Sequence, residues 1–243
     1  MSRRIKTIEY DCIGSTNAEA KKYAVENDGR APVLFLAREQ SAGRGRLGRS
    51  FYSSLKGGIY MSLLYFTESE LSDAVSITTA AAVFAAEAIE RAVGKKMKIK
   101  WVNDIYNEQG KVAGILTEAV SVGKDTAVIV GIGINTGAAD FPEELRKIAS
   151  SIGDVSEEKR AEMIDYISGA LLDHAEDPTS REYMAGYRER FMLEGAQVDL
   201  LRAGEIIARG KVLGVSDDGG LLFLRDGESQ SEIIHTGEVS VRS

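Results

Sequence analysis

The stretch Gly43-Arg44-Gly45-Arg46-Leu47-Gly48-Arg49 places three arginines among three glycines in a chain of 243 residues. Arginine offers a planar set of hydrogen-bond donors that matches carboxylate and phosphate groups. Glycine lets the backbone come close to a bound group. The stretch therefore predicts a flexible loop that orders over an anionic ligand, and a solvated basic loop is the simpler alternative.

The same glycines match the G-x-G-x-x-G pattern of dinucleotide-binding folds, and residues 33–37 supply a preceding apolar strand. A Rossmann turn must lead directly into a helix that receives the pyrophosphate. The residues that follow here are small and turn-forming: Gly48, Ser50, Ser53, Ser54, Gly57 and Gly58. The chain also lacks the H-R-D and D-F-G elements of protein kinases. Both readings are therefore excluded.

Composition narrows the class of protein further. The formal net charge is -7, which argues against general affinity for DNA or for anionic membranes. Cys12 is the only cysteine, so internal disulfides are excluded, and we expect a small packed thiol in a cytoplasmic protein. Residues 1–6 lack the apolar core of a signal peptide, and no apolar run reaches membrane-spanning length.

On the N-terminal side of the loop, the pattern predicts a strand over residues 5–10 and a helix to about residue 27. Thr16 and Glu19 are spaced as a capping box for that helix. Ser15 and Asn17 lie beside this cap and could also face a site. A second strand, residues 33–40, then delivers Gln40 to the arginine loop.

On the C-terminal side, residues 58–66 predict a buried strand, and Ser72 is placed to cap an alanine-rich helix ending near Gly94. Residues 97–106 and 111–116 have the form of two strands joined by a hairpin with Gly110 in its turn. Asn103 and Asp104 there are either a turn pair or site residues. Lys111 is either an exposed strand end or a site residue.

Glycines at every second position, Gly131 and Gly133, remove side chains from one face of the strand over residues 127–135. A flat apolar ligand or a closely packed helix could fill the space. Further helices are expected after Ala138, one with Pro142 in its first turn and two starting at Ser156 and Ser180. Short strands after residue 194 predict a small β-barrel, so we expect domains at 1–194 and 195–243.

Together these stretches resemble the motifs of biotin protein ligases. Residues 43–49 resemble the family's G-R-G-R-x-G-R loop, residues 100–104 its K-W-P-N-D motif, and residues 131–135 its G-x-G-I-N strand end. The closing residues 237–240 match as well, so the resemblance covers essentially the whole chain. It implies an α+β fold: a mixed β-sheet backed by helices, similar to class II aminoacyl-tRNA synthetase cores and lipoate ligases, with a C-terminal SH3-like β-barrel.

The resemblance also implies an activity. Such enzymes use ATP and Mg²⁺ to convert biotin to biotinyl-5'-AMP, and then transfer biotin to one lysine of a carboxylase's biotin carboxyl carrier domain. Some members carry an N-terminal DNA-binding domain and repress transcription. This chain begins at the catalytic domain, so we expect neither DNA binding nor repression. A homodimer is a further implication of the family.

Site roles follow from the resemblance by position. The catalytic set is Arg44, Arg46, Lys111 and Asp104, of which the cations hold the biotin carboxylate and the adenylate phosphate. The biotin-binding set is Ser15, Thr16, Asn17, Gln40, Gly43, Arg44, Lys111, Gly114, Leu116, Gly131 and Gly133. The ATP-binding set is Arg46, Arg49, Phe51, Lys100, Asn103 and Asn135, with the Phe51 ring positioned to stack on adenine and Mg²⁺ near Asp104 and Asn135.

Two positions depart from the family pattern. Val102 replaces the motif's proline, and Leu47 stands where some members have another arginine. We expect Val102 to loosen the backbone before Asn103 without removing a functional group, and Leu47 to reduce the local charge with the chemistry intact. Two other functions compete with the ligase: lipoate or octanoyl transfer on the same fold, which would lack the arginine loop, and a module that binds biotin and nucleotide without transfer.

Overall fold

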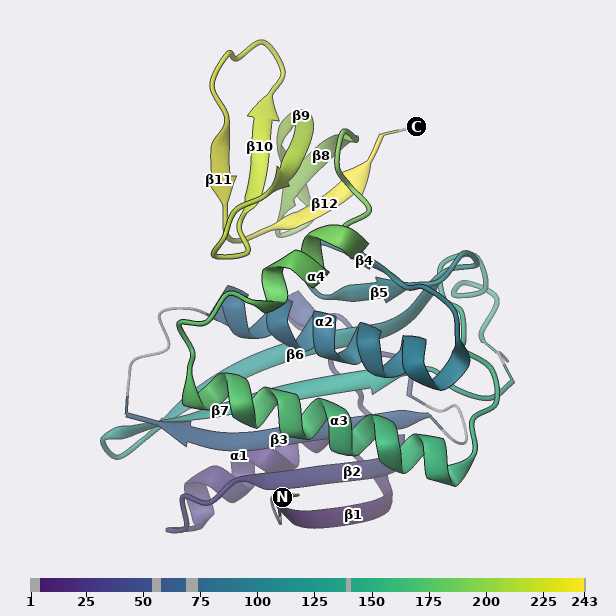
Figure 1. The fold of residues 1–243 in the computed structure, drawn as a ribbon, viewed down its shortest axis with the longest axis vertical. Helices are drawn as coiled ribbons and strands as arrows, with labels where there is room; N and C mark the ends of the chain where they lie inside the picture. Colours follow the sequence, from purple (N-terminus) through teal and green to yellow (C-terminus); the bar gives the residue numbers. More distant parts are fainter. Residues whose placement is uncertain (1–4, 54–57, 69–73, 139–140, 243) are drawn as a thin grey trace.

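The computed structural model describes residues 5–53, 58–68, 74–138 and 141–242. Its larger part is an α+β unit built on a seven-stranded sheet with the order β1-β2-β3-β7-β6-β5-β4 (Figure 1). The strands are β1 (Lys6–Ile13), β2 (Val33–Gln40), β3 (Ile59–Thr67), β4 (Lys98–Lys100), β5 (Asp104–Tyr106), β6 (Lys111–Val122) and β7 (Asp125–Ile134). The β1–β2 pair is parallel and the other pairs are antiparallel, so the predicted mixed sheet is confirmed.

Helices cover both faces of this sheet (Figure 1). They are α1 (Thr16–Glu26), α2 (Ala74–Val93), α3 (Glu157–Glu176) and α4 (Tyr183–Arg190). The larger hydrophobic core lies under α2, α3 and α4, and a smaller one lies between α1 and the opposite face. Alanines of α2, including Ala80, Ala81 and Ala85, are fully buried, because a short side chain allows the helix to approach the sheet closely.

A second sheet is antiparallel, with the order β11-β10-β9-β8-β12, and stands beyond α4 (Figure 1). Its strands are β8 (Gln197–Arg202), β9 (Glu205–Val215), β10 (Leu221–Arg225), β11 (Glu232–Ile234) and β12 (Glu238–Val241). The turn before β10 reaches the larger unit, where Trp101 Nε1 donates a hydrogen bond to the Gly219 carbonyl at 3.0 Å. The first four of these strands are predicted by the turn spacing, and β12 is not.

The helix ends differ from the expected ones in three places. The N-cap of α1 is Ser15, and Thr16 already belongs to the helix, so the Thr16–Glu19 capping box is wrong. The Thr16 amide instead donates to the Gln40 side-chain oxygen at 2.8 Å. Ser156 caps α3 as predicted, by accepting from the Lys159 amide. Residues 143–148 form turns rather than a helix, and α4 begins after Ser180, at Tyr183. The Ser72 cap lies outside the described residues.

The segment 97–106 is not one strand. It divides into β4 and β5 around a tight turn at residues 101–103, and the Trp101–Val102 peptide bond is cis. The turn places Lys100 and Asp104 opposite each other as paired residues of adjacent strands. The side chains of Lys100 and Asp104 therefore lie next to each other in the sheet.

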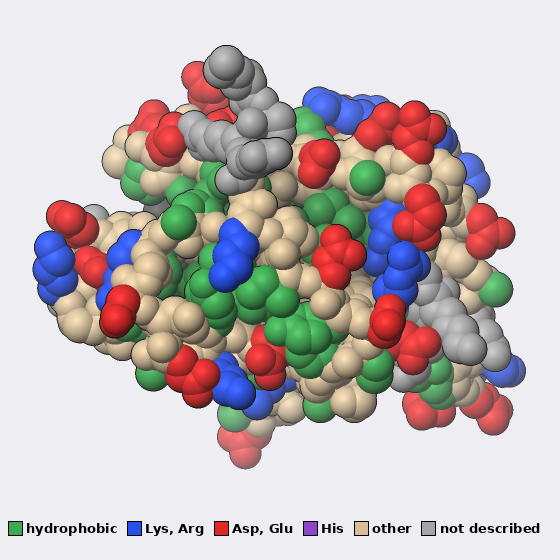
Figure 2. Space-filling view, turned by 90° about the horizontal axis from the view of Figure 1, so that it is seen from below, with side chains coloured by type: hydrophobic (Ala, Val, Ile, Leu, Met, Phe, Trp, Pro, Cys, Tyr) green, Lys and Arg blue, Asp and Glu red, His purple; other side chains and the backbone are tan. Residues whose placement is uncertain are grey.

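Cys12 was expected to be packed, but it is exposed on β1. The physical reason is that β1 is an edge strand, so its side chains receive less cover. Figure 2 views the molecule from below the orientation of Figure 1, and it shows hydrophobic side chains gathered at the centre with charged side chains around them. None of the helices in the described part of the chain is long and apolar enough to cross a membrane.

Candidate active site

A cavity of about 170 Å³ lies where the arginine loop meets the strands β5, β6 and β7. Most of the residues singled out in the sequence line it: Ser15, Thr16, Asn17, Gln40, Arg44, Arg46, Arg49, Phe51, Lys100, Asn103, Asp104, Lys111, Gly114, Leu116, Gly131 and Gly133. Residues 237–239 of the second sheet complete the wall. Segments far apart in the chain thus form one site.

The arginine loop is folded back on itself. The Gly45 amide donates to the Arg49 carbonyl at 2.7 Å, and the Phe51 amide donates to the Gly43 carbonyl at 2.9 Å. A short 3₁₀ turn over Arg46–Gly48 lies between these bonds. Two backbone hydrogen bonds therefore hold the ends of the loop together, and the arginines extend from this hydrogen-bonded backbone.

Arg46 is the arginine most enclosed by the site. Its Nη1 lies 3.4 Å from Asn103 Oδ1. Burial lowers the pKa of the Arg46 guanidinium, while the nearby carboxylates of Asp104 and Glu238 act in the opposite direction. A guanidinium stays charged at working pH. A positive charge with little water around it interacts strongly with an incoming anion.

Lys111 and Asp104 form an ion pair across β6 and β5, with 2.7 Å between Nζ and Oδ1. Their side chains are 28% and 25% exposed, so about three quarters of each side chain is shielded from solvent. Lys111 Nζ also lies 5.8 Å from the centre of the Phe51 ring. Lys111 therefore lines the cavity and is not a solvated strand end.

A polar network built on α1 forms one side of the cavity. Gln40 Oε1 accepts from the Thr16 hydroxyl at 3.2 Å, in addition to the Thr16 amide. Ser62 Oγ lies 2.7 Å from Thr16 Oγ1 and 2.6 Å from Asn17 Oδ1. Asn17 Nδ2 donates to Glu118 Oε2 at 2.9 Å. Because each polar atom holds its neighbour, the network has a fixed order of donors and acceptors.

The alternating glycines of β7 face two different neighbours. A Cβ at Gly131 would lie 2.0 Å from Asn17 Oδ1, so close approach by helix α1 explains this glycine. A Cβ at Gly133 would lie 2.5 Å from the Phe51 ring, and one at Gly114 would lie 3.2 Å from it. The ring of Phe51 therefore lies in the space that Gly133 and Gly114 leave open.

Two predicted residues are not among those that line the cavity in the described part of the chain. Gly43 is buried where a Cβ would meet Ser53 Oγ at 2.2 Å. Asn135 is buried, and its Nδ2 donates to the Ser150 carbonyl at 3.0 Å. Gly43 is therefore constrained by packing against Ser53 and Asn135 is held by a hydrogen bond, and neither residue lines the cavity.

Sequence reasoning did not identify Ser62 and Glu118, which hold the polar network, or Glu238, which lines the cavity. Ser62 and Glu118 belong to strands whose patterns indicate only packing. Glu238 pairs with Arg49 and brings the second sheet against the arginine loop. The signal that could have identified Glu238 is the acidic residue inside the Gly237-Glu238-Val239-Ser240 match.

Comparisons with known proteins agree on one family. The model of the biotin/lipoate A/B protein ligase family matches residues 10–135. The bifunctional ligase/repressor BirA of Bacillus spizizenii is 36% identical over 228 residues, which are 89% of this chain and 68% of the relative. The biotin--[acetyl-CoA-carboxylase] ligase of Paracoccus denitrificans is 32% identical and is covered to 96%, against 93% of this chain.

Solved structures agree as well. A biotin protein ligase from Aquifex aeolicus in complex with biotin and ATP is similar with a TM-score of 0.76 and 29% identity, over 98% of both chains. The similarity therefore extends through both sheets.

Proposed function

This chain belongs to the biotin/lipoate A/B protein ligase family and is a biotin protein ligase, and we propose how its residues carry the two steps of that activity. The observation that supports the assignment most is the meeting of Arg46, Lys111 and Asp104 beside the glycine wall of one cavity. In the first step, biotin and ATP give biotinyl-5'-AMP and pyrophosphate. In the second, biotin passes to a lysine.

The first step requires positive charge rather than a base. An oxygen of the biotin carboxylate forms a bond to the α-phosphorus of ATP, and the bond from that phosphorus to pyrophosphate breaks. Anions must be held together in line for this displacement. We assign the charge to Arg44, Arg46 and Lys111, which present donors to the same cavity.

Biotin binding is assigned to the side of the cavity that carries the polar network. Ser15, Thr16, Asn17 and Gln40 supply polar groups there, and Thr16, Asn17 and Gln40 are held by hydrogen bonds. A ureido ring carries both donors and an acceptor, which such an ordered network can match. The walls are assigned to Gly114, Leu116, Gly131 and Gly133, and Gly43 supports the wall from behind.

ATP binding is assigned to the side that carries the loop. Arg46, Arg49, Lys100 and Asn103 surround it, and Asn135 supports it. Phe51 is assigned to stack on adenine. Since its ring lies against Gly133 and Gly114, this role requires the ring to keep or regain a face open to the nucleotide.

Mg²⁺ fits this set of residues in one way. Among the described residues no group of three His, Cys, Asp or Glu side chains could hold a metal. Mg²⁺ is usually bound by one or two carboxylates together with substrate phosphates. The Asp104 carboxylate lines the cavity, and Asn135 Oδ1 is buried without a hydrogen-bond partner in the described structure. We propose that the Asp104 carboxylate would hold Mg²⁺ together with substrate phosphates, with Asn135 near that position, and that the ion would neutralise phosphate charge there.

The second step transfers the biotinyl group to an amine. The nitrogen of a neutral lysine attacks the carbonyl carbon of the adenylate, a C–N bond forms, and AMP leaves with the former carboxylate oxygen. We propose that Asp104 orients this amine and accepts its proton. The acceptor is proposed to be the biotin carboxyl carrier domain of a carboxylase, as the name of the Paracoccus relative indicates.

The domain boundary and the oligomeric state complete the proposal. We propose that residues 1–194 form the catalytic domain and residues 195–243 an SH3-like domain, since the second sheet begins at Gln197. We also propose a homodimer, for which ultracentrifugation with and without biotin and ATP is the test.

The assay for the proposed function measures biotin-dependent pyrophosphate release by the purified chain with ATP and Mg²⁺, with a carrier domain in a parallel reaction. We expect release in both and labelled carrier in the second. Biotin binding without release would support a binding module, and release driven only by lipoate would support lipoate transfer. Either result would contradict the ligase.

A further inference from the structure

Helix α4 lies behind the segment 97–104, on the side away from the cavity. We infer that Tyr187 of α4 is a positioning residue for the ligase reaction, and that it acts by fixing the Val102 carbonyl and thereby the side chains of Asn103 and Asp104. The inference rests on the proposed function of those two residues. It concerns a buried residue that is not among those lining the cavity.

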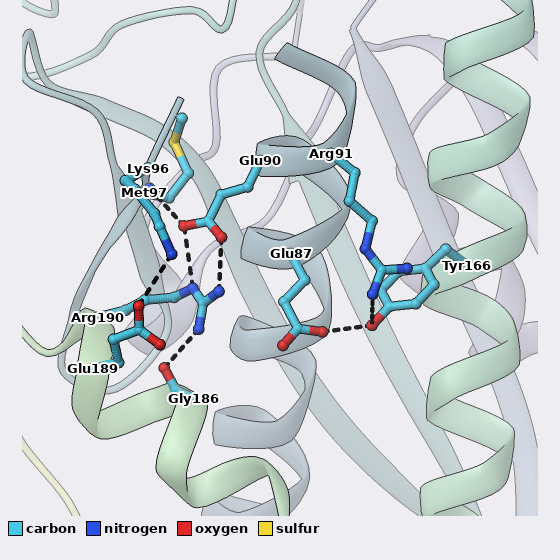
Figure 3. Close-up of polar contacts among 9 residues, drawn as sticks. All are labelled: Glu87, Glu90, Arg91, Lys96, Met97, Tyr166, Gly186, Glu189 and Arg190. Atoms are coloured by element: carbon cyan, nitrogen blue, oxygen red, sulfur yellow. Dashed lines mark hydrogen bonds and ion pairs between the residues drawn. The ribbon is translucent and has the colours of Figure 1, made fainter. Parts of the chain in front are cut away.

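The first support is an anchor at the start of the segment. Glu90 of α2 accepts a hydrogen bond from the Met97 amide at 2.8 Å and pairs with Arg190 of α4 at 2.7 Å (Figure 3). Burial opposes ionisation of Glu90, but the hydrogen bonds from Arg190 and Met97 lower its pKa below the usual value. Arg190 also donates to the Gly186 carbonyl at 2.9 Å within α4. The end of α4 and the start of β4 are therefore held on one carboxylate.

The second support is a contact at the middle of the segment. Two residues after α4 ends, the Met192 amide donates a hydrogen bond to the Ile99 carbonyl at 3.1 Å. Phe191 stacks on Tyr187, with 6.2 Å between ring centres and 24° between ring planes. The backbone of β4 thus runs alongside the end of α4. This arrangement leaves the Tyr187 ring little freedom to move.

The third support is the Tyr187 hydroxyl itself. Tyr187 is fully buried, and its hydroxyl donates to the Val102 carbonyl at 3.2 Å. Burial raises the pKa of this hydroxyl well above its usual range, and the nearby Asp104 charge acts in the same direction. The group is therefore a donor at any working pH. It is aimed at the turn between β4 and β5.

The hydrogen bond from Tyr187 affects the cavity because its acceptor, the Val102 carbonyl, is in the same peptide unit as the Asn103 amide. The Val102 carbonyl and the Asn103 amide belong to one rigid unit, so fixing the carbonyl fixes the start of Asn103. Asn103 then donates through Nδ2 to the Ile115 carbonyl at 2.8 Å and accepts from Arg46. Asp104 follows directly and pairs with Lys111. A small rotation of this peptide would displace two groups that face the substrates.

The test compares Tyr187→Phe with Tyr183→Phe. Tyr183 lies on the same helix, is also buried, and its hydroxyl contacts Ser76 and Thr79 at 2.8 and 3.2 Å, away from the cavity. Each variant loses one buried hydroxyl, so we expect similar falls in melting temperature. We expect Tyr187→Phe alone to slow single-turnover adenylate formation about tenfold, with the biotin Kd changed less than about twofold.

A second measurement separates positioning from a general loss of rigidity. In an Asp104→Asn background, Tyr187→Phe should cost less than about twofold further, because residues acting through one another are not additive. An equal loss in both backgrounds, an equal loss in Tyr183→Phe, or a parallel weakening of biotin binding would overturn the inference. If Tyr187→Phe does not fold, Arg190→Lys should give a smaller loss of rate, and an unchanged rate would overturn it. An inactive wild-type chain would instead contradict the proposed function.

Discussion

Lys111 Nζ and Asp104 Oδ1 lie 2.7 Å apart on adjacent strands, so the charge proposed to attract the substrates is paired before they bind. A bound phosphate must compete with the Asp104 carboxylate for this ammonium group. The pair also holds a flexible lysine at the cavity. Under the proposed roles, both partners affect the first step, and Asp104 affects the second as well.

The first prediction concerns this pair. Lys111→Ala should slow adenylate formation by about 10²- to 10³-fold, the usual cost of losing a preorganised charged donor. Lys124→Ala is the matched control, because its ion pair with Glu68 is long and exposed. Biotin-dependent pyrophosphate release measures both variants, and thermal unfolding checks that each is folded. A rate near that of the wild type in Lys111→Ala would refute the assignment.

The second prediction concerns the glycine wall. Gly133→Ala would place a Cβ 2.5 Å from the Phe51 ring, so the ring or β7 must shift. We expect a loss of about 1–3 kcal/mol in the free energy of unfolding, the usual cost of overpacking, and weaker biotin binding. Denaturant unfolding and calorimetry measure the two effects.

The control for this substitution is Gly169→Ala in α3, where an added Cβ meets nothing within 4 Å. Replacing a helical glycine by alanine should stabilise the chain by up to about 1 kcal/mol and leave biotin binding unchanged. Equal behaviour of the two variants would show that the space at Gly133 is not constrained.

Many residues that line the cavity can be predicted from the sequence, because their motifs combine charged side chains with glycines at positions where a side chain would not fit. The arginine loop, Lys111 and the β7 glycines carry such signals, and the structure brings them together. The turn inside residues 97–106 cannot be predicted from the sequence, because its apolar residues fit a continuous strand equally well. Tertiary contact decides there, through the hydrogen bond from Tyr187 to the Val102 carbonyl.

The capping box failed for a related reason. The Thr16–Glu19 spacing is a local signal, but the Thr16 amide donates its hydrogen bond to the side chain of Gln40, 24 residues away. Ser62 and Glu118 were missed because their partners also come from distant segments. Local patterns therefore predicted which segments form the site, while long-range hydrogen bonds determined how the side chains are used.

The third prediction concerns the pH dependence of stability. Hydrogen bonds from Ser216 and His235 lower the pKa of Asp218 to about 2. A carboxyl whose pKa is lower in the folded state contributes stability above its unfolded pKa, near 3.9. That contribution should be lost as pH falls from about 4 to about 2. Urea unfolding of the wild type and of Asp218→Asn over this range measures it, and the variant should show a weaker dependence on pH.

Asp226→Asn is the control for this measurement, because Asp226, like Asp218, lies in a turn between strands of the second sheet, and it pairs with Arg242 at 2.9 Å. It should keep the part of the pH dependence that Asp218 causes. An identical pH dependence in the wild type and in Asp218→Asn would contradict the prediction. Asp218 also lies beside Gly219, whose carbonyl accepts a hydrogen bond from Trp101 Nε1.

The fourth prediction concerns the contact between Glu238 of β12 and Arg49 of the arginine loop. Arg49 is 68% exposed, and a surface ion pair contributes roughly 0–1 kcal/mol, so Glu238→Gln should leave the free energy of unfolding nearly unchanged. The Glu238 carboxylate is also close enough to Arg46 to act on its guanidinium, whose pKa it raises. Removing it should free Arg49 from the second sheet and raise the KM for ATP several-fold, with biotin binding retained.

The matched control for Glu238→Gln is Glu232→Gln, because Glu232 pairs with Arg225 inside the second sheet and far from the loop in the chain. Steady-state pyrophosphate release at varied ATP, with calorimetric biotin titration, distinguishes the two variants. An unchanged KM for ATP in Glu238→Gln would show that the second sheet completes the cavity wall without influencing the nucleotide. A raised KM confined to Glu238→Gln would mean that β12 acts on the loop through this single contact, since the rest of the sheet is intact in both variants.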